Sequence, residues 1–278
     1  MKKILKKILP VNISNKLRAA EDASKLNRLP IETCDFEALR KIDSQTLSQI
    51  FNNEDLKAEY QAIRPVVKNL GLPEDTGGVN IGDQQAIFYL IKHFKPQNVL
   101  EVGTFIGCST VHIALAQKDK PDAKLTTVDI RNVNDPTTKP WINHGSKSAP
   151  SQNITEVGCA DKVTFIAQDS KKYLATYDGP KYDFIFLDGS HKATEVYLEI
   201  PKSLDILAEG GIILLHDYFP DNAILWKDSP RTISGPYLGV ERLRKENKDM
   251  VHAVPFGNLP WKTKLGTNTT SLAIFTKK

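Results

Sequence analysis

Short apolar runs alternate with amphipathic segments along most of the chain. The runs NVLEV, KLTTVDI, KVTFIA, YDFIFLD and GGIILLHD have strand-like length and composition. Segments with helical spacing lie between them, such as CSTVHIALAQK and ATEVYLEIPKSLDIL, and a further helix is predicted over residues 81–94. Strands that alternate with helices predict a mostly parallel sheet with helices on both faces and right-handed crossovers.

The two ends of the chain have different patterns. Residues 1–78 are polar and helical in spacing and contain no strand-like alternation, which predicts a helical N-terminal extension. Residues 79–278 would then form the sheet domain. Near the C-terminus, DMVHAVPF and TSLAIFTKK are joined by a loop and predict an antiparallel pair at the edge of the sheet.

Charge and composition exclude several classes of protein. The net charge of +4 is too small to indicate a nucleic-acid partner, because much of the lysine excess lies at the two ends. No segment has the apolar length of a membrane span, and lysines interrupt the basic N-terminal segment MKKILKKILP, so we expect no integral membrane segment and no signal peptide. Three widely spaced cysteines fit a reducing cytoplasm, and a homo-oligomer is compatible with the sequence.

The turn LEVGTFIGCST, residues 100–110, brings a carboxylate and two glycines together after an apolar run. Its spacing is neither that of a dinucleotide-binding turn nor that of a phosphate loop. We expect Gly103 and Gly107 to let the backbone turn sharply and a ligand approach closely. Glu101 would repel a pyrophosphate but attract a ligand that carries an ammonium and a sulfonium.

Acidic residues recur where the predicted parallel strands end. Glu101, Asp129, Asp188 and Asp217 lie at or just after these ends, where open α/β sheets bind their ligands. Asp129 has the position of the acid that pairs with ribose hydroxyls in nucleoside-binding folds. Four acids on one rim predict a positive partner, and together with the glycine turn they indicate S-adenosylmethionine.

The order of the motifs LEVGTFIGCST, TTVD, AQDS, YDFIFLDGSH and GGIILLHDY resembles that of class I S-adenosylmethionine-dependent methyltransferases. Within that class the chain is most similar to the macrocin- and mycinamicin-type sugar O-methyltransferases and to cephalosporin-hydroxylase-like proteins. The resemblance implies a Rossmann-like, doubly wound, seven-stranded and mostly parallel sheet with one antiparallel edge strand.

The resemblance also implies a set of cofactor contacts. The glycine turn would surround the methionine part, Asp129 would hold the ribose, and the AQDS segment would lie beside the adenine; an N-cap role for Asp169 is equally compatible with that segment. The expected cofactor-binding residues are Glu101, Gly103, Thr104, Gly107, Ser109, Asp129, Asp169 and Ser170.

The last two acids indicate a divalent cation. A metal ion can bind the acceptor hydroxyl and lower its pKa, and Asp188 and Asp217 can supply two of the oxygen ligands that Mg²⁺ prefers. By resemblance, Asp188 and His191 in DGSH take the catalytic roles of metal ligand and general base. His216 stands where the macrocin-type pattern has an acid, so it is either a ligand of a softer ion such as Mn²⁺ or a core residue.

Two long polar loops that follow Asp129 and Asp217 contain Trp141 and Trp226 and have the composition of lids over the site. The sequence therefore predicts a metal-assisted O-methyltransferase that acts on a hydroxyl of a small polar molecule such as a sugar or polyol. The alternatives are an N-methyltransferase, a protein of the hydroxylase-like branch, and a cofactor-binding protein without turnover.

Overall fold

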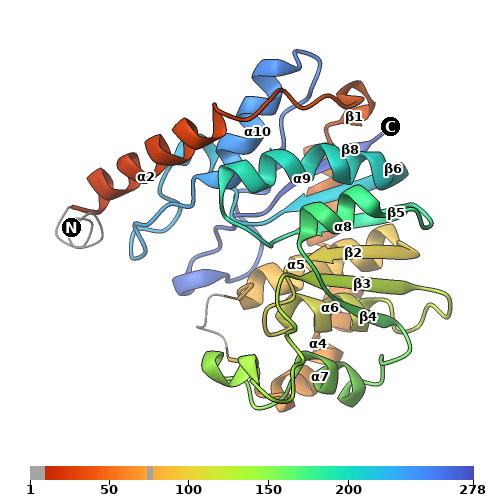
Figure 1. Cartoon of the computed structure of the whole chain (residues 1–278). Helices are drawn as coiled ribbons and strands as arrows, with labels where there is room; N and C mark the ends of the chain where they lie inside the picture. Colours follow the sequence, from red (N-terminus) through yellow and green to blue (C-terminus); the bar gives the residue numbers. More distant parts are fainter. Residues whose placement is uncertain (1–9, 74–77) are drawn as a thin grey trace.

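The computed structural model describes residues 10–73 and 78–278, and the basic segment at residues 1–9 lies outside this range. Its centre is one twisted sheet with the strand order β1-β8-β6-β5-β2-β3-β4, and β7 also pairs with β8 (Figure 1). The strands are β1 (Leu39–Arg40), β2 (Asn98–Val102), β3 (Lys124–Asp129), β4 (Val163–Ala167), β5 (Tyr182–Leu187), β6 (Leu207–Leu215), β7 (Val254–Pro255) and β8 (Ala273–Lys277).

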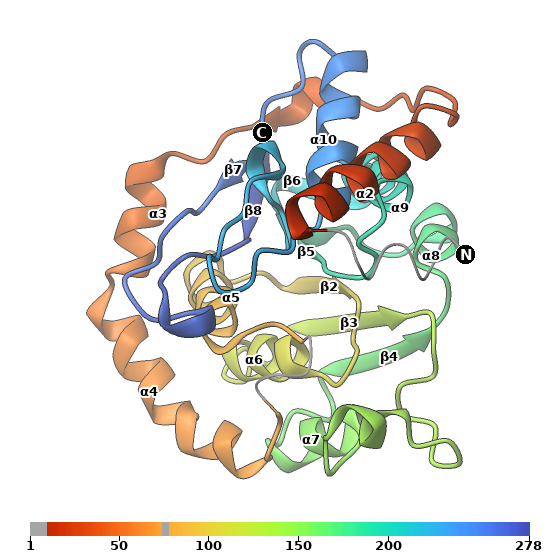
Figure 2. The same cartoon turned by 90° about the vertical axis from the view of Figure 1, so that its left-hand side faces the viewer.

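Helices cover both faces of the sheet. On one face lie α3 (Ser44–Phe51), α4 (Glu54–Asn69), α5 (Ile81–Phe94), α6 (Cys108–Ala116) and α7 (Pro150–Glu156); Figure 2 shows α3 and α4 along one side of the molecule. On the other face lie α2 (Val11–Leu26), α8 (Ser170–Thr176), α9 (Ala193–Ile206) and α10 (Gly235–Glu246). Short 3-10 helices connect these elements: η1 (Phe36–Ala38), η2 (Pro140–His144), η3 (Pro220–Asn222) and η4 (Lys264–Gly266).

The alternation of side chains in the central strands builds the two cores. In β5, Phe184 and Phe186 point into the first core, whereas Ile185 and Leu187 point into the second. All four are buried because helices cover both faces of the parallel strands. The predicted doubly wound α/β sheet is thus confirmed.

The edge of the sheet differs in detail from the prediction. The antiparallel strand β8 pairs with β6 on one side, while β1 and β7 pair with its other side, so the sheet has eight strands rather than seven. The sequence did not predict β1, because a strand of two residues is too short to show the alternation of apolar and polar side chains. Buried Leu39 and the hydrogen bond from Thr276 Oγ1 to Arg40 O (3.1 Å) hold it in place.

The division of the chain at residue 78 stays a prediction. Helices α3 and α4 contribute Ile50, Leu56 and Tyr60 to the same core as α5 and α6. On the opposite face, α2 contacts α9 and α10, and Asn15 Nδ2 donates to Pro230 O (2.7 Å). The N-terminal segment is therefore continuous with the packing of the sheet domain.

The order of the strands reverses between β2 and β5. From β2 the chain proceeds outward through β3 and β4, and it then returns to the other side of β2 to form β5 and β6. In sheets of this kind, ligands bind in the crevice beyond the carboxyl ends of the strands at such a reversal. Four of the acids singled out in the sequence lie at or just after these strand ends.

Candidate functional site

Three cavities open side by side at this edge of the sheet. The glycine-loop cavity (about 220 Å³) is lined by Gly103, Thr104, Ser109, Asp129, Asp188 and His191. The outer cavity (about 590 Å³) is lined by Asp129, Ile130, Gln168, Asp169, Ser170 and His191. The tryptophan cavity (about 480 Å³) is lined by His191, His216, Asp217, Trp226, Lys264 and Ser271. His191 lines all three cavities, so it lies where they meet.

The two glycines serve the backbone of the turn more than the approach of a ligand. Gly103 has φ +101°, and a Cβ there would lie 2.3 Å from the carbonyl oxygen of Asp188. Gly107 has φ +83°, and a Cβ would lie 3.1 Å from Pro150 Cβ. Both conformations favour glycine. At Gly103 the close neighbour is the loop after β5, which packs against the end of β2.

Glu101 lies beneath the glycine-loop cavity and does not line it. Its Oε2 accepts hydrogen bonds from Thr110 Oγ1 (2.5 Å) and Thr127 Oγ1 (2.6 Å), and among the described residues its buried Oε1 has no partner. Burial raises the pKa of the Glu101 carboxyl to about 7, although the hydroxyls around it oppose that shift. A buried carboxylate oxygen without a partner beside a cavity suits a cationic ligand group.

Asp129 is held rigidly at the boundary of two cavities. Its Oδ2 accepts from the Phe105 amide and its Oδ1 from the Arg131 amide, both at 3.0 Å. The side chain of Arg131 also lies 3.4 Å from Oδ1. Asp129 lines both the glycine-loop cavity and the outer cavity, and its role as the ribose contact stays a prediction.

Asp169 and Ser170 line the outer cavity and also begin helix α8. Asp169 is the N-cap, since its Oδ1 accepts from the Lys172 amide (3.1 Å). The hydroxyl of Ser170 donates to Glu199 Oε1 (2.5 Å), and burial raises the pKa of this carboxyl to about 7. The N-cap role that the sequence left open is therefore present, and it is compatible with a place beside a ligand.

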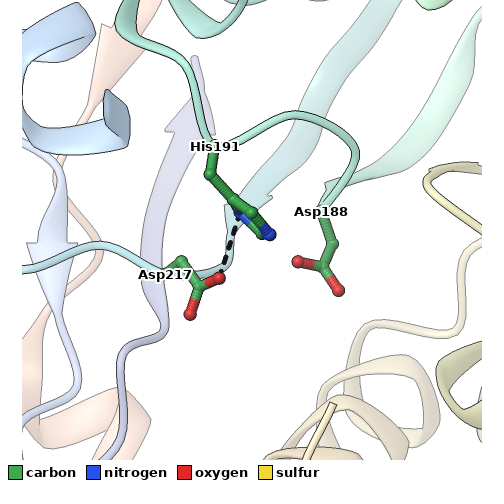
Figure 3. Close-up of side chains that lie close together, drawn as sticks. All are labelled: Asp188, His191 and Asp217. Carbon is green, nitrogen blue, oxygen red and sulfur yellow. Dashed lines mark ion pairs between the residues drawn. The ribbon is translucent and has the colours of Figure 1, made fainter. Parts of the chain in front are cut away.

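Asp188, His191 and Asp217 converge at the meeting point of the cavities (Figure 3). Asp188 directly follows β5, His191 lies further along the same loop, and Asp217 follows β6. Each offers one ligand atom, and these atoms lie within 4.8 Å of one another. His191 Nδ1 lies 3.1 Å from Asp217 Oδ2. Such a group of two carboxylates and one imidazole can bind a divalent cation.

His216 lies beneath this group, and carboxylates face both of its ring nitrogens. Nδ1 lies 2.8 Å from Asp188 Oδ1, and Nε2 lies 3.3 Å from Oδ2 of the fully buried Asp83. Burial alone would lower the pKa of His216, but the charges of Asp188 and Asp217 and the hydrogen bonds to Asp188 and Asp83 raise it well above its usual value.

An imidazolium with both N–H groups directed at carboxylates offers no lone pair to a metal ion. Carboxylates therefore engage both ring nitrogens of His216, and its role as a metal ligand stays a prediction. Asp83 was not singled out at all. An acid in the first turn of a predicted helix is ordinarily explained by the helix dipole, and no sequence signal marks it as buried.

The two predicted lids differ in where their tryptophans point. Trp141 packs with Ile106, Cys108 and Ala149 and anchors its loop to the glycine turn. Trp226 lines the tryptophan cavity, packs against Phe219 with ring centroids 5.7 Å apart, and donates from Nε1 to Thr269 O (3.3 Å). Only the second tryptophan is placed to contact a molecule in that cavity.

The fold and the site have the features expected from the resemblance to class I S-adenosylmethionine-dependent methyltransferases. The strand order of the parallel sheet reverses at β2, a carboxylate lies beneath the glycine turn, and an acid after the next strand bounds two cavities. In the part of the chain that the structure describes, no helix is long and apolar enough to cross a membrane.

Comparison with known proteins agrees with this class. Residues 100–218 match the family model described as a methyltransferase domain. Tapetum-specific methyltransferase 1 from Arabidopsis thaliana is 26% identical over 180 residues, which are 64% of this chain and 69% of the relative. A caffeoyl-CoA O-methyltransferase from Stellaria longipes is 29% identical over 135 residues, 46% of this chain and 49% of the relative.

Solved structures share the fold. The O-methyltransferase TomG from Streptomyces achromogenes, in complex with S-adenosylmethionine, has a TM-score of 0.53 at 16% identity and covers 95% of this chain and 98% of its own. The O-methyltransferase from Bacillus cereus, in complex with S-adenosylhomocysteine, has a TM-score of 0.52 at 15% identity and covers 95% and 99%. Residues 100–218 thus match a methyltransferase domain, and the fold of the chain is the one found in these O-methyltransferases.

Proposed function

We propose that this methyltransferase transfers the methyl group to a hydroxyl of a small polar molecule, a sugar, polyol or related metabolite, with the help of a divalent cation. The observation that carries the proposal is the group of Asp188, His191 and Asp217 at the junction of three cavities. Relatives named caffeoyl-CoA O-methyltransferases support oxygen as the methylated atom.

The residues around the glycine-loop and outer cavities fit the cofactor. The unpartnered Oε1 of Glu101 would face the cationic methionine part through the layer of Thr104 and Ser109, and Asp129 would accept from the ribose hydroxyls. Ile130 and Gln168 would line the adenine end, beside Asp169 and Ser170. When bound, S-adenosylmethionine supplies a methyl group on a positively charged sulfur.

The donor set also fits a divalent cation. The three carboxylates of Asp83, Asp188 and Asp217 and the imidazolium of His216 leave two formal negative charges at this point. Asp188 and Asp217 would be the ligands, and Mg²⁺ or Mn²⁺ matches their oxygen atoms. When bound, the cation lowers the pKa of an acceptor hydroxyl.

His191 is the proposed proton acceptor. Its Nδ1 is directed at Asp217 Oδ2, so Nε2 is the nitrogen that remains to receive a proton from the acceptor hydroxyl. The side chain is half exposed at the mouth of all three cavities and can pass the proton on to solvent. His216 would keep the Asp188 carboxylate in place from below.

The test is methyl transfer from isotopically labelled S-adenosylmethionine to a panel of hydroxylated acceptors. We expect labelled product with Mg²⁺ or Mn²⁺, loss of transfer with EDTA, and recovery when metal is added back. Product NMR would assign the methyl to oxygen or nitrogen. Transfer that is unchanged by EDTA would contradict the metal role, and methylation confined to amines would contradict the proposed acceptor.

A further inference from the structure

Side chains of opposite charge line the tryptophan cavity. Asp217 and His191 line it, and His191 also lines the glycine-loop cavity. Lys264 lines the same cavity from the 3-10 helix η4, which belongs to a separate loop between β7 and β8. A molecule that places a hydroxyl at Asp217 therefore has a cation within the same volume of about 480 Å³.

Lys264 is an exposed lysine, and no ion pair joins it to a carboxylate among the described residues. Its Nζ lies 5.1 Å from the centroid of the Trp226 ring. The neighbouring Lys262, on the same loop, is also exposed but does not line the cavity. The two lysines therefore differ in position rather than in chemistry or exposure.

The loop that carries Lys264 is held in a defined shape. Thr263 donates from its amide to Thr267 O (2.7 Å) and from Oγ1 to Thr269 O (2.6 Å). Leu265 adopts the left-handed conformation with φ +54°, which a leucine adopts only where its surroundings impose it. The same Thr269 carbonyl accepts from Trp226 Nε1, so the loop and the tryptophan wall are joined.

Ser271 provides a second polar contact point in the cavity. It is 1% exposed, and its hydroxyl has no hydrogen-bond partner among the residues that the structure describes. Because it also lines the tryptophan cavity, its buried hydroxyl is available to a polar group of a bound molecule. Trp226 and Ile233 add apolar surface to the lining of the cavity.

We propose that the acceptor of this enzyme is a hydroxylated acid: it carries an anionic group, a carboxylate or a phosphate, that pairs with Lys264. The apolar face of its ring or chain lies against Trp226, and its reacting hydroxyl lies at the Asp217 end. This inference rests on the proposed function, because it uses the same cavity for the acceptor. It adds that the charge of the acceptor, rather than its hydroxyl alone, determines recognition.

The experiment compares acceptors in matched neutral and acidic pairs: glucose with glucuronate and with glucose 6-phosphate, and catechol with 3,4-dihydroxybenzoate. The enzyme variants are Lys264→Ala, Lys264→Arg and, as a matched control, Lys262→Ala. We expect the acidic member to have about tenfold higher kcat/KM in the unaltered enzyme, because a charge-assisted hydrogen bond contributes roughly that factor. Lys264→Ala should remove the preference by raising KM for the acidic member.

Two further arms complete the test. Lys264→Arg should retain most of the preference, Lys262→Ala should retain all of it, and added salt should raise KM for the acid alone. Equal kcat/KM within each pair, or an equal loss for both members in Lys264→Ala, would overturn the inference while leaving the proposed function intact. If no pair is methylated, the proposed function is contradicted. The inference is then tested by comparing how the neutral and the acidic member of each pair bind to the unaltered enzyme and to the variants, as measured by ligand-observed NMR.

Discussion

Asp83, His216 and Asp188 form a row of charged side chains in which His216 contacts both carboxylates. Replacing Asp83 by asparagine removes one charge from this row. The substitution keeps the size of the side chain. Asp83 is fully buried, its Oδ2 lies 3.3 Å from His216 Nε2, and the same oxygen accepts from Asn80 Nδ2 (2.6 Å). We expect Asp83→Asn both to destabilise the fold and to impair methyl transfer.

The magnitude follows from the distance and the burial. Two unit charges 3.3 Å apart at an effective dielectric constant of about 20 interact by about 5 kcal/mol. Measured losses on removing one partner of a buried ion pair are about 3–5 kcal/mol. For a chain of this size each kcal/mol shifts Tm by about 2–4 °C, so Asp83→Asn should lower Tm by about 6–20 °C.

Calorimetry of the unaltered protein and of Asp83→Asn at pH 7 measures this shift. Asp119→Asn is the control, because its side chain is 86% exposed beside Lys92 and should leave Tm within about 2 °C. Methyl transfer by Asp83→Asn should fall even at temperatures where the variant is folded, since His216 no longer fixes Asp188, whereas the Kd of the cofactor should hold within about twofold. An unchanged Tm would refute the claim that the contact between Asp83 and His216 stabilises the fold.

Three further predictions follow from the site. Asp188→Asn should lower turnover by about 10²-fold or more while leaving the Kd for S-adenosylhomocysteine nearly unchanged, because the residue acts on the acceptor side; a proportional loss of both would argue against that role. Asp129→Ala should weaken the Kd for S-adenosylhomocysteine, measured by calorimetry, before it affects the acceptor KM, and an unaltered Kd would remove the ribose contact from the account. Glu199→Gln should change how stability depends on pH: burial raises the pKa of Glu199 from 4.5 to about 7, so between these values the folded state binds a proton that the unfolded state has released, and stability falls as pH rises. In chemical denaturation, the free energy of unfolding of the unaltered protein should fall by about 3 kcal/mol across that pH window because of Glu199, and this fall should be absent in Glu199→Gln. Parallel pH profiles of the two proteins would contradict this expectation.

The central strands and the acids that end them were predictable because they depend on local pattern. β2, β3 and β5 lie in NVLEV, KLTTVDI and YDFIFLD, and a parallel sheet brings their carboxyl ends to one edge whatever the loops do. The proximity of Asp188 and Asp217 follows from the same rule, since β5 and β6 are neighbours.

The features that could not be predicted depend on contacts between distant segments. Asp83 and His216 are 133 positions apart, and only the packing of α5 against the sheet makes them partners. The glycine at 103 is required by the loop after β5, which no local pattern reveals. Trp141 and Trp226 lie in loops of similar composition, yet one packs inward and the other lines a cavity.

We propose above all that Asp188 and Asp217 bind a divalent cation at the junction of the cavities. Electron paramagnetic resonance of free Mn²⁺ titrated with the protein counts bound ions directly and does not depend on knowing the acceptor. We predict one Mn²⁺ bound per chain, with affinity reduced about tenfold or more in Asp188→Asn and in Asp217→Asn. Absence of Mn²⁺ binding to the unaltered protein would contradict this proposal. So would an affinity of both variants equal to that of the unaltered protein.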